Sequence, residues 1–346
     1  MQITVMGAGI LGLSAAWELA RRGASVRVVE AARVGAGSSG GVVGALAPHV
    51  PEHWNAKKAF QFESLVMAEG FWRGVAEAGG IDPGYARLGR VQPLPDDSAV
   101  ALARQRGEAA RDLWQGMAEW RVCGPLPGLR LASATGLYVL DTLSARLSPR
   151  GAARALLAAL AARGIAVEQG HEAPDGPVLW ATGVQGLADL GADLGRDMGN
   201  GVKGQAALLA ADWRGAPQIF AEGVHVVPHA DGTVAVGSTS ERVFDTPDGT
   251  DGQLDTVINR VRALCPDLEA APVMMRWAGV RPRSVTRAPI LGAWPGRPGW
   301  FVLNGGFKIG FGMAPKLADL SARLILDGED AVPKGFRLDH ALGAVG

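Results

Sequence analysis

ITVMGAGILGLSAAWELARRGASVRVVE, residues 3–30, is the stretch that decides the fold of this 346-residue chain. It opens on apolar, partly β-branched residues that predict a strand, and the glycine turn at 7–12 leads into a helical segment. Residues 25–30 then alternate as a second strand that ends in an acid. This order of strand, glycine turn, helix, strand and acid is the fingerprint of dinucleotide-binding βαβ units.

Each position of the turn has a mechanical role. Gly7 permits the tight turn, Gly9 leaves room for a pyrophosphate to reach the backbone, and Gly12 lets the helix pack close to the sheet. The helix directs its unpaired N–H groups and positive dipole end at the phosphates. Glu30 is placed to accept hydrogen bonds from ribose hydroxyls, and its charge would repel the 2′-phosphate of NADP. A βαβ unit that binds no nucleotide is the alternative.

The composition excludes several classes of protein. Hydrophobic residues make up 48% of the chain and charged residues 20%, which is typical of a soluble globular protein with room for about two domains. Lys and Arg together number 34, as do Asp and Glu, so nothing favours binding to nucleic acid or to an anionic membrane. The most apolar helical run, residues 152–162, is interrupted by Arg154 and is too short to span a bilayer.

Cys123 and Cys265 are the only cysteines, which excludes a disulfide framework and a cysteine-rich metal site. No spacing of His, Asp or Glu is typical of a metal site, so we expect no metal. The sequence opens directly on a predicted strand, without the basic and apolar regions of a signal peptide. We therefore expect a cytoplasmic protein.

Two further segments favour a long cofactor. The loop at residues 31–49 is rich in glycine and hydroxyl groups, so that its amides and Ser38 or Ser39 can reach a second part of the cofactor; a plain flexible loop is the alternative. The apolar run 177–183 ends in Ala-Thr-Gly, which places small residues at the carboxyl end of a strand, where open α/β sheets bind ligands.

The rest of the chain alternates between helical and strand-like patterns. Helices are predicted at 56–78, 98–120, 150–163, 252–264 and 313–326, and strands at 85–95, 136–140, 165–168, 204–209, 224–229, 233–239, 276–283 and 300–303. Asp231-Gly232 predicts a hairpin turn between two of these strands. The nucleotide-binding pattern recurs at the start, middle and end of the chain, with β-rich insertions between.

These motifs, in this order, resemble those of FAD-dependent amine and D-amino-acid oxidoreductases, and most of all those of glycine oxidase and sarcosine oxidase relatives. The resemblance covers nearly the whole chain. The motifs that carry it are the 7–30 fingerprint, the 35–44 loop, Ala181-Thr182-Gly183, Lys203-Gly204-Gln205, residues 224–229 with 237–239, Gly279-Val280-Arg281-Pro282 and residues 306–315.

The resemblance implies an α/β fold in which a Rossmann-type FAD-binding domain of the glutathione reductase kind carries an inserted substrate domain with a mixed β-sheet. We expect the FAD-binding domain at 1–82, 146–201 and 284–346, and the substrate-binding domain at 83–145 and 202–283. It also implies oxidation of the C–N bond of a small amino acid or secondary amine that carries a carboxylate. Hydride passes from the carbon that bears nitrogen to the flavin, and the resulting imine is hydrolysed. The electron acceptor is oxygen or a redox carrier.

Four side chains are the candidate catalytic residues. Arg281 stands in the setting where the family has its carboxylate-binding arginine, and a guanidinium can pair with a carboxylate in bidentate fashion. Arg283 is the second choice, and a surface or interdomain salt bridge is the alternative for Arg281. Lys308 matches a position near the substrate where relatives carry Arg or Lys, or else is an exposed lysine at a helix entry. His225 is a candidate for binding substrate or a packed strand histidine, and His49, with Pro51, His53 and Trp54, is expected to line the pocket or lie in a plain loop.

The cofactor is expected to contact the glycine turns and the strand ends. The backbone at 309–312 is expected to direct N–H groups and a helix N-terminus at the flavin pyrimidine edge, where negative charge appears on reduction. The full set of expected cofactor-binding residues is Gly7, Ala8, Gly9, Ile10, Leu11, Gly12, Glu30, Ala31, Arg33, Ser38, Ser39, Gly44, Ala45, Leu46, Ala181, Thr182, Gly183, Gly279, Arg281, Gly306, Phe307, Lys308, Ile309, Gly310 and Phe311.

The chain departs from the family at three points. Glycine oxidase relatives have Tyr where His225 stands and Arg where His229 stands, which leaves the substrate open. Tyr85 and Tyr138 are the only tyrosines, so a tyrosine clamp of the D-amino-acid oxidase kind is not expected. Neither cysteine lies near Arg281, where some sarcosine oxidases attach the flavin, so we expect noncovalent FAD.

Other functions remain open from the sequence alone. A dehydrogenase of the same fold would oxidise an amino acid or a 2-hydroxy acid and use an acceptor other than oxygen. A flavin-binding protein without turnover and a nicotinamide-binding module are the alternatives from other classes. The sequence leaves the oligomeric state open.

Overall fold

The computed structural model describes residues 2–171 and 176–344. Its strands are β1 (Gln2–Met6), β2 (Ser25–Glu30), β3 (Ala45–Leu46), β4 (Arg90–Pro93), β5 (Trp120–Cys123), β6 (Tyr138–Asp141), β7 (Ala145–Arg146), β8 (Val167–Gln169), β9 (Val178–Trp180), β10 (Gly199–Ala210), β11 (Gln218–Ala221), β12 (Val224–Pro228), β13 (Thr233–Gly237), β14 (Val273–Ser284), β15 (Ile290–Ala293) and β16 (Trp300–Asn304). Its α-helices are α1 (Ile10–Arg21), α2 (Ala56–Gly79), α3 (Asp97–Leu113), α4 (Pro149–Ala161), α5 (Gly183–Leu194), α6 (Gly252–Leu264), α7 (Gly310–Ala322) and α8 (Leu338–Gly343).

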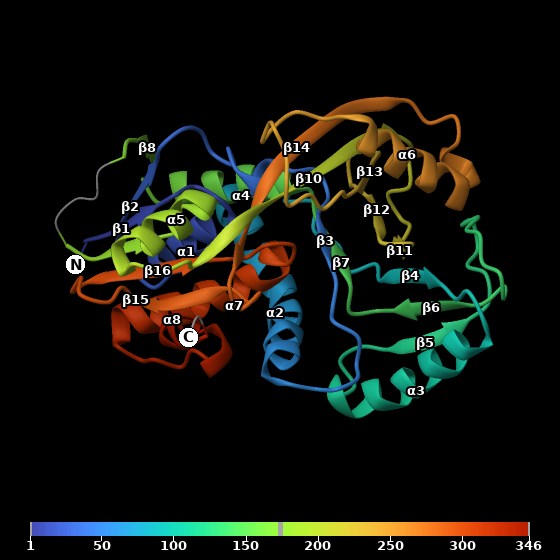
Figure 1. The fold of residues 1–346 in the computed structure, drawn as a ribbon, viewed down its shortest axis with the longest axis horizontal. Helices are drawn as coiled ribbons and strands as arrows, with labels where there is room; N and C mark the ends of the chain where they lie inside the picture. The colour runs from blue at the N-terminus through green and yellow to red at the C-terminus, as the bar shows by residue number, and fades with distance from the viewer. Residues whose placement is uncertain (1, 172–175, 345–346) are drawn as a thin grey trace.

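A six-stranded sheet carries the first βαβ unit, in the order β15-β16-β9-β1-β2-β8. All its pairings are parallel except that of β15 with β16. Neighbouring residues of β16 point to opposite faces, because strand side chains alternate. Leu303 packs in the core with α1 and α7, whereas Val302 packs with α5 and α8. The sheet is therefore covered by helices on both faces, as a mostly parallel sheet requires (Figure 1).

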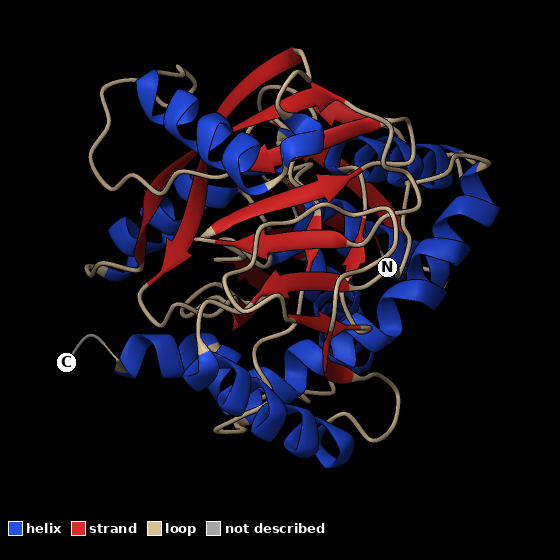
Figure 2. Ribbon diagram, turned by 90° about the vertical axis from the view of Figure 1, so that its right-hand side faces the viewer, coloured by secondary structure: helices blue, strands red, loops and turns tan. Residues whose placement is uncertain are grey.

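An eight-stranded sheet forms the other part of the molecule, in the order β14-β10-β13-β12-β11-β4-β6-β5. The sheet is mixed, since β11 and β4 pair in parallel, whereas the pairs β11–β12, β4–β6 and β5–β6 are antiparallel. Its longest strands, β10 and β14, pair along their length from Gly199 opposite Ser284 onward and reach back toward the six-stranded sheet (Figure 1). Helices lie outside the strands of both sheets (Figure 2). The predicted α/β fold with an inserted mixed sheet is confirmed, while the exact domain boundaries stay a prediction.

The predicted hairpin at Asp231-Gly232 joins β12 to β13, and the predicted helix 252–264 matches α6. The helix expected at 98–120 is wrong in its last part: α3 ends at Leu113, and the chain turns at Gln115 and Gly116, both with left-handed φ. That turn allows Trp120 to begin β5 and to lie beside Trp114 in the core.

Other boundaries were also wrong. The strand expected at 85–95 is reduced to β4, and α7 begins at Gly310 and continues through a π-helical turn, Arg323–Asp327, to Gly328. Helix α5, short strands such as β11 and β15, and helix α8 had no predicted counterpart.

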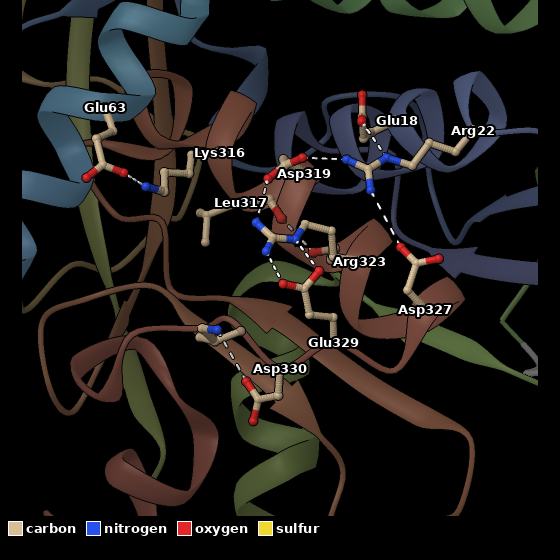
Figure 3. A network of polar contacts seen from close by, with 12 residues as sticks. Glu18, Arg22, Glu63, Lys316, Leu317, Asp319, Arg323, Asp327, Glu329 and Asp330 are labelled. Atoms are coloured by element: carbon tan, nitrogen blue, oxygen red, sulfur yellow. Dashed lines mark hydrogen bonds and ion pairs between the residues drawn. The ribbon is translucent and has the colours of Figure 1, made fainter.

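Polar contacts fix α7 against the helices around it (Figure 3). Arg22, the residue after α1, contacts Asp319 of α7 and also Glu18 of α1, 2.8 Å away. Arg323 contacts Asp319 and Glu329. The Arg22–Asp319 pair thus joins α7 to the end of α1, and at the other end of α7 a Cβ at Gly310 would meet Ile10 of α1.

Candidate active site

A cavity of about 960 Å³ lies between the carboxyl ends of β1, β2 and β9 and the strands β10 and β14 of the other sheet. Its size is at the upper end of the range for ligand pockets, roughly 300–1,000 Å³. It extends from the end of β2 past the β1–α1 turn to the loop before α7. Segments from the start, middle and end of the chain therefore line one cavity.

Most of the residues singled out in the sequence meet in this cavity. The lining includes Gly7, Gly9, Ile10, Leu11, Glu30, Ala31, Ser38, Ser39, Ala45, Ala181, Thr182, Gly183, His225, Gly279, Arg281, Gly306, Phe307, Lys308, Gly310 and Phe311. The expected residues that are not in the lining are Ala8, Gly12, Arg33, Gly44, Leu46, Ile309 and His49. Of these, Ala8 and Leu46 are fully buried, Gly44 packs against the Leu147 carbonyl, and Arg33 is exposed.

The first glycine turn is built by close contacts that side chains would prevent. Gly7 has φ +103°, and a Cβ there would lie 2.5 Å from the Ala181 carbonyl oxygen. A Cβ at Gly12 would lie 1.9 Å from the Gly7 carbonyl oxygen, so the absence of a side chain brings α1 against the turn. At Gly9 a Cβ would meet only the Ser39 side chain within 4 Å, with Oγ 3.2 Å away. Gly9 thus leaves a space that opens to the cavity.

Polar groups organise the turn around this space. The Ile10 N–H donates to Ser39 Oγ at 2.9 Å. Glu30 Oε2 accepts from the Ala8 N–H at 2.7 Å and Glu30 Oε1 from the Ala32 N–H at 3.0 Å. The Glu30 carboxylate therefore joins the end of β2 to the turn, and each oxygen keeps a further lone pair for a ligand hydroxyl.

Three helices begin at the cavity, and in each the N-cap residue makes no capping bond with its own side chain: Gly9 in α1, Thr182 in α5 and Ile309 in α7. In α1 the first N–H group, that of Ile10, is taken by Ser39 Oγ. The first N–H groups of a helix have no intrahelical partner, and with the dipole they favour an anion. An extended dinucleotide fits this arrangement, with a diphosphate near α1, the space at Gly9 for close approach and Glu30 at the end of β2.

Arg281 lies at the other end of the cavity, where the protein already holds its guanidinium. Nη2 donates to the Thr239 and Lys203 carbonyls at 2.7 and 3.0 Å, Nη1 donates to Ser238 Oγ at 3.0 Å, and Nε points to the Val202 carbonyl at 3.4 Å. Burial lowers the pKa of Arg281 to about 10. The bidentate carboxylate pairing expected from the sequence is not available in this conformation, because a guanidinium has only five N–H donors.

The Lys203-Gly204-Gln205 motif supports this arginine. A Cβ at Gly204 would lie 1.9 Å from Arg281 Nη2, so only glycine leaves room for the guanidinium. Lys203 Nζ lies 3.6 Å from a Glu241 carboxylate oxygen, and Gln205 Nε2 donates to Glu241 Oε1 at 3.1 Å. These buried groups stabilise the part of β10 whose carbonyls accept hydrogen bonds from Arg281.

The cationic groups of Lys308, Arg283 and Arg281 all lie near the aromatic ring of Phe307. Lys308 Nζ lies 5.7 Å from the ring centroid, and the Cζ atoms of Arg281 and Arg283 each lie 5.8 Å from it. Burial and the nearby Arg281 charge lower the pKa of Lys308. The sequence placed Arg281 and Lys308 in one site, and the structure brings them together.

His225 lies on β12 against Phe220, with ring centroids 4.6 Å apart. Burial, with the charges of Arg90 and Lys308, lowers the pKa of His225 to about 3, so the imidazole is neutral. Its Nδ1 is shielded from solvent and has no hydrogen-bond partner among the described residues. His229 is buried outside the cavity lining, and burial lowers its pKa.

The remaining candidate residues lie away from the end of the cavity that holds Arg281 and Lys308. His49 is half-buried and contacts Gln61 of α2 through its backbone N–H, at 2.8 Å, and through Nδ1. Burial lowers the pKa of His49. Pro51, His53 and Trp54, and also both cysteines, are absent from the described cavity lining.

Several lining residues were missed by sequence reasoning. Trp277 lies against Gly279, where a Cβ would come within 2.4 Å of its ring. Strand alternation from Arg281 through Gly279 to Trp277 would have identified it. Phe220 carries no such signal, because only the pairing of β11 with β12 brings it beside His225 at the cavity. Ser238 belongs to the 237–239 motif but had not been singled out as a site residue.

Metal-binding clusters and membrane-spanning helices are both absent from the residues that the structure describes. No group of three or more His, Cys, Asp or Glu side chains in residues 2–171 and 176–344 is placed to hold a metal ion. In the same residues, no helix has both the length and the apolar character needed to cross a bilayer.

The comparisons with known proteins agree with this geometry. The chain is 29% identical to a glycine oxidase of Pseudomonas putida over 99% of each sequence, and 27% identical to a glycine oxidase of Geobacillus kaustophilus over 99% of this chain and 98% of that sequence. Among solved structures, iminodiacetate oxidase from Chelativorans sp. BNC1 superposes with a TM-score of 0.83 at 23% identity, over 96% of this chain and 97% of that one. The glycine oxidase structure from G. kaustophilus gives 0.78 at 22% identity, over 96% of each chain.

The sequence profile of the FAD dependent oxidoreductase family, DAO, matches residues 2–324. That range includes the starts of α1, α5 and α7, Glu30 and the cluster around Phe307. This chain belongs to the family of FAD dependent oxidoreductases.

Proposed function

We propose that this FAD-dependent oxidoreductase oxidises the C–N bond of a small amino acid, or of a secondary amine, that carries a carboxylate. The observation that carries the proposal is the single cavity that joins an anion-binding helix start and Glu30 at one end to Lys308 and Arg281 at the other. The glycine oxidase relatives, similar over almost their whole length, support the same class of substrate.

FAD supplies the hydride acceptor when it is bound. At the dinucleotide end, we propose that the N-terminus of α1 binds the diphosphate and that Glu30 accepts hydrogen bonds from the adenosine ribose. The first N–H groups of α7 would stabilise the negative charge that reduction places on the flavin ring. Neither cysteine lines the cavity, which supports noncovalent binding.

At the substrate end, we propose that the Lys308 ammonium pairs with the substrate carboxylate. Arg281 adds its one remaining N–H and the field of a charge held in place by three backbone carbonyls and Ser238. This orients the substrate so that its α-carbon faces the flavin. His225, with a pKa of about 3, is too weak a base near neutral pH to take the amine proton, so its role is to bind and shape the pocket. His49 is outside the proposed catalytic set.

The test is anaerobic mixing of the purified holoenzyme with glycine, sarcosine, D-amino acids and 2-hydroxy acids, followed by the loss of flavin absorbance. We expect bleaching by amino acids or N-substituted glycines and release of a carbonyl compound with ammonia or a primary amine. Bleaching by hydroxy acids alone would refute C–N oxidation, and bleaching by none of them would refute catalysis of this kind. Reoxidation by air, compared with an artificial acceptor, distinguishes an oxidase from a dehydrogenase.

A further inference from the structure

Three cationic side chains gather around Phe307 at the substrate end of the cavity. Arg281 and Lys308 line the cavity, Arg283 lies beside them, and all three are within about 6 Å of the Phe307 ring centroid. None of the three forms an ion pair within the described parts of the chain: the carboxylate whose charge acts on Arg281, Glu241, is already paired with Lys203 at 3.6 Å. One substrate carboxylate balances only part of this charge.

The chain as a whole is neutral, with 34 basic and 34 acidic residues, so this excess of positive charge is a local feature. On the same strand, by contrast, Arg276 is paired with Asp255. Burial lowers the pKa of Arg283, and the neighbouring charges of Arg287 and Arg242 lower it further. Such a cluster persists in a folded protein only at a cost, because like charges repel, so its presence at a cavity mouth indicates an anionic ligand.

The three side chains are not equivalent. Arg281 is bonded to carbonyls and to Ser238. The Arg283 and Lys308 side chains lie against the Phe307 ring and make no hydrogen bond within the described residues. Arg283 lies two residues beyond Arg281 on the same face of β14, outside the cavity lining. An anionic group bound by Lys308 and Arg281 inside the cavity and one bound by Arg283 outside its lining would therefore be two separate groups.

Phe307 sets this spacing. Its φ of 43° is in the left-handed region, which a bulky residue rarely adopts, and its N–H donates to the Pro282 carbonyl at 3.0 Å. Backbone strain of this kind is retained where the surrounding structure imposes it, and often at functional sites. The ring stands among the three cations and keeps them apart.

We propose that the preferred substrate carries a second carboxylate, which Arg283 binds at the rim of the cavity while Lys308 and Arg281 hold the first. The inference rests on the proposed function, since it names the class of amino acid that the site oxidises. The second carboxylate is either on a substituent of the nitrogen, as in iminodiacetate, or on the side chain, as in aspartate.

The test compares binding and turnover in the wild-type holoenzyme, in Arg283→Gln and in the control Arg276→Gln. Arg276 is an exposed arginine on the same strand, paired with Asp255. The binding measurement uses diacids and monoacids that contain no amine, glutarate and succinate against butyrate and propionate, detected by perturbation of the flavin spectrum. We expect the diacids to bind at least tenfold more tightly in the wild type and in Arg276→Gln, and Arg283→Gln to lose that preference.

The turnover measurement uses iminodiacetate and both enantiomers of aspartate against sarcosine and alanine. We expect kcat/KM to be highest for one of the dicarboxylate substrates. The Arg283→Gln change should lower kcat/KM for that substrate by a factor ten times larger than for sarcosine or alanine, mainly by raising KM. A preference for iminodiacetate would place the second carboxylate on the nitrogen substituent, and a preference for aspartate would place it on the side chain.

Binding of diacids no tighter than monoacids in the wild type would overturn the proposal, as would an equal loss in both variants. If the diacids bind as expected but no amine bleaches the flavin, the proposed function fails and the second anion site stands.

Discussion

Gly9 and Gly12 belong to the same turn, yet alanine at the two positions should have separable effects. At Gly12 the added Cβ would lie 1.9 Å from the Gly7 carbonyl oxygen, a backbone atom that cannot rotate away. Overpacking of this kind costs about 3 kcal/mol, and alanine in a helix recovers about 1 kcal/mol relative to glycine. We therefore expect Gly12→Ala to lower the free energy of unfolding of the cofactor-free protein by about 2 kcal/mol.

At Gly9 the added Cβ would meet only the Ser39 side chain, 3.2 Å away at Oγ, and the backbone φ of −81° suits alanine. The cofactor-free Gly9→Ala protein should be as stable as the wild type. The methyl group would occupy the space proposed for the diphosphate, so the Kd for FAD should rise at least tenfold, or about 1.4 kcal/mol.

The assay is urea unfolding of the cofactor-free proteins, with FAD titration followed by flavin fluorescence. A Gly12→Ala protein as stable as the wild type would refute the packing argument. A Gly9→Ala protein that is destabilised but binds FAD normally would refute the role of the space at Gly9.

Three further substitutions test other parts of the molecule. Glu30→Ala removes the acceptor of the Ala8 and Ala32 N–H groups, so FAD should be lost more readily, and full occupancy after dialysis would count against the ribose role. Burial holds the pKa of His225 at about 3, below the ordinary 6.5, so the wild type should lose stability as pH falls from about 6.5 toward 3. His225→Gln should show a shallower loss in acid unfolding curves, and equal slopes would contradict the assignment. Asp319→Asn should lower the free energy of unfolding by about 0.5–1 kcal/mol at low salt. That difference should shrink in about 1 M NaCl.

Much of the fold could be predicted because its signals are local. The turn at Gly7–Gly12, the Asp231-Gly232 hairpin and helix α6 each follow from spacing or turn chemistry within a few residues. The end of α3 could not be found in this way, since the apolar pattern continues to Trp120 while the chain turns at Gln115 and Gly116. Short strands such as β11 depend on partners far away in the sequence and have no pattern of their own.

In the candidate site, too, features with a local sequence signal could be predicted and those that depend on distant residues could not. Arg281 and Lys308 were found from their motifs. The Arg281 guanidinium, however, donates hydrogen bonds to the carbonyls of Lys203 in β10 and of Thr239 after β13, and no local pattern indicates these bonds. The position of Arg283 beside Phe307 depends on the left-handed φ of Phe307, a feature of the folded chain. His49 was expected in the pocket from its place after the second loop, and Gln61 instead holds it against α2.

The central claim is that distant glycine turns and a cationic cluster hold one dinucleotide, with its flavin ring beside Lys308. A crystal structure of the purified protein with FAD tests it most directly. We expect the adenosine ribose at Glu30, the diphosphate at the start of α1 and the flavin ring between the start of α7 and Lys308. An FAD bound elsewhere, or one whose ring lies away from Lys308 and Arg281, would contradict it.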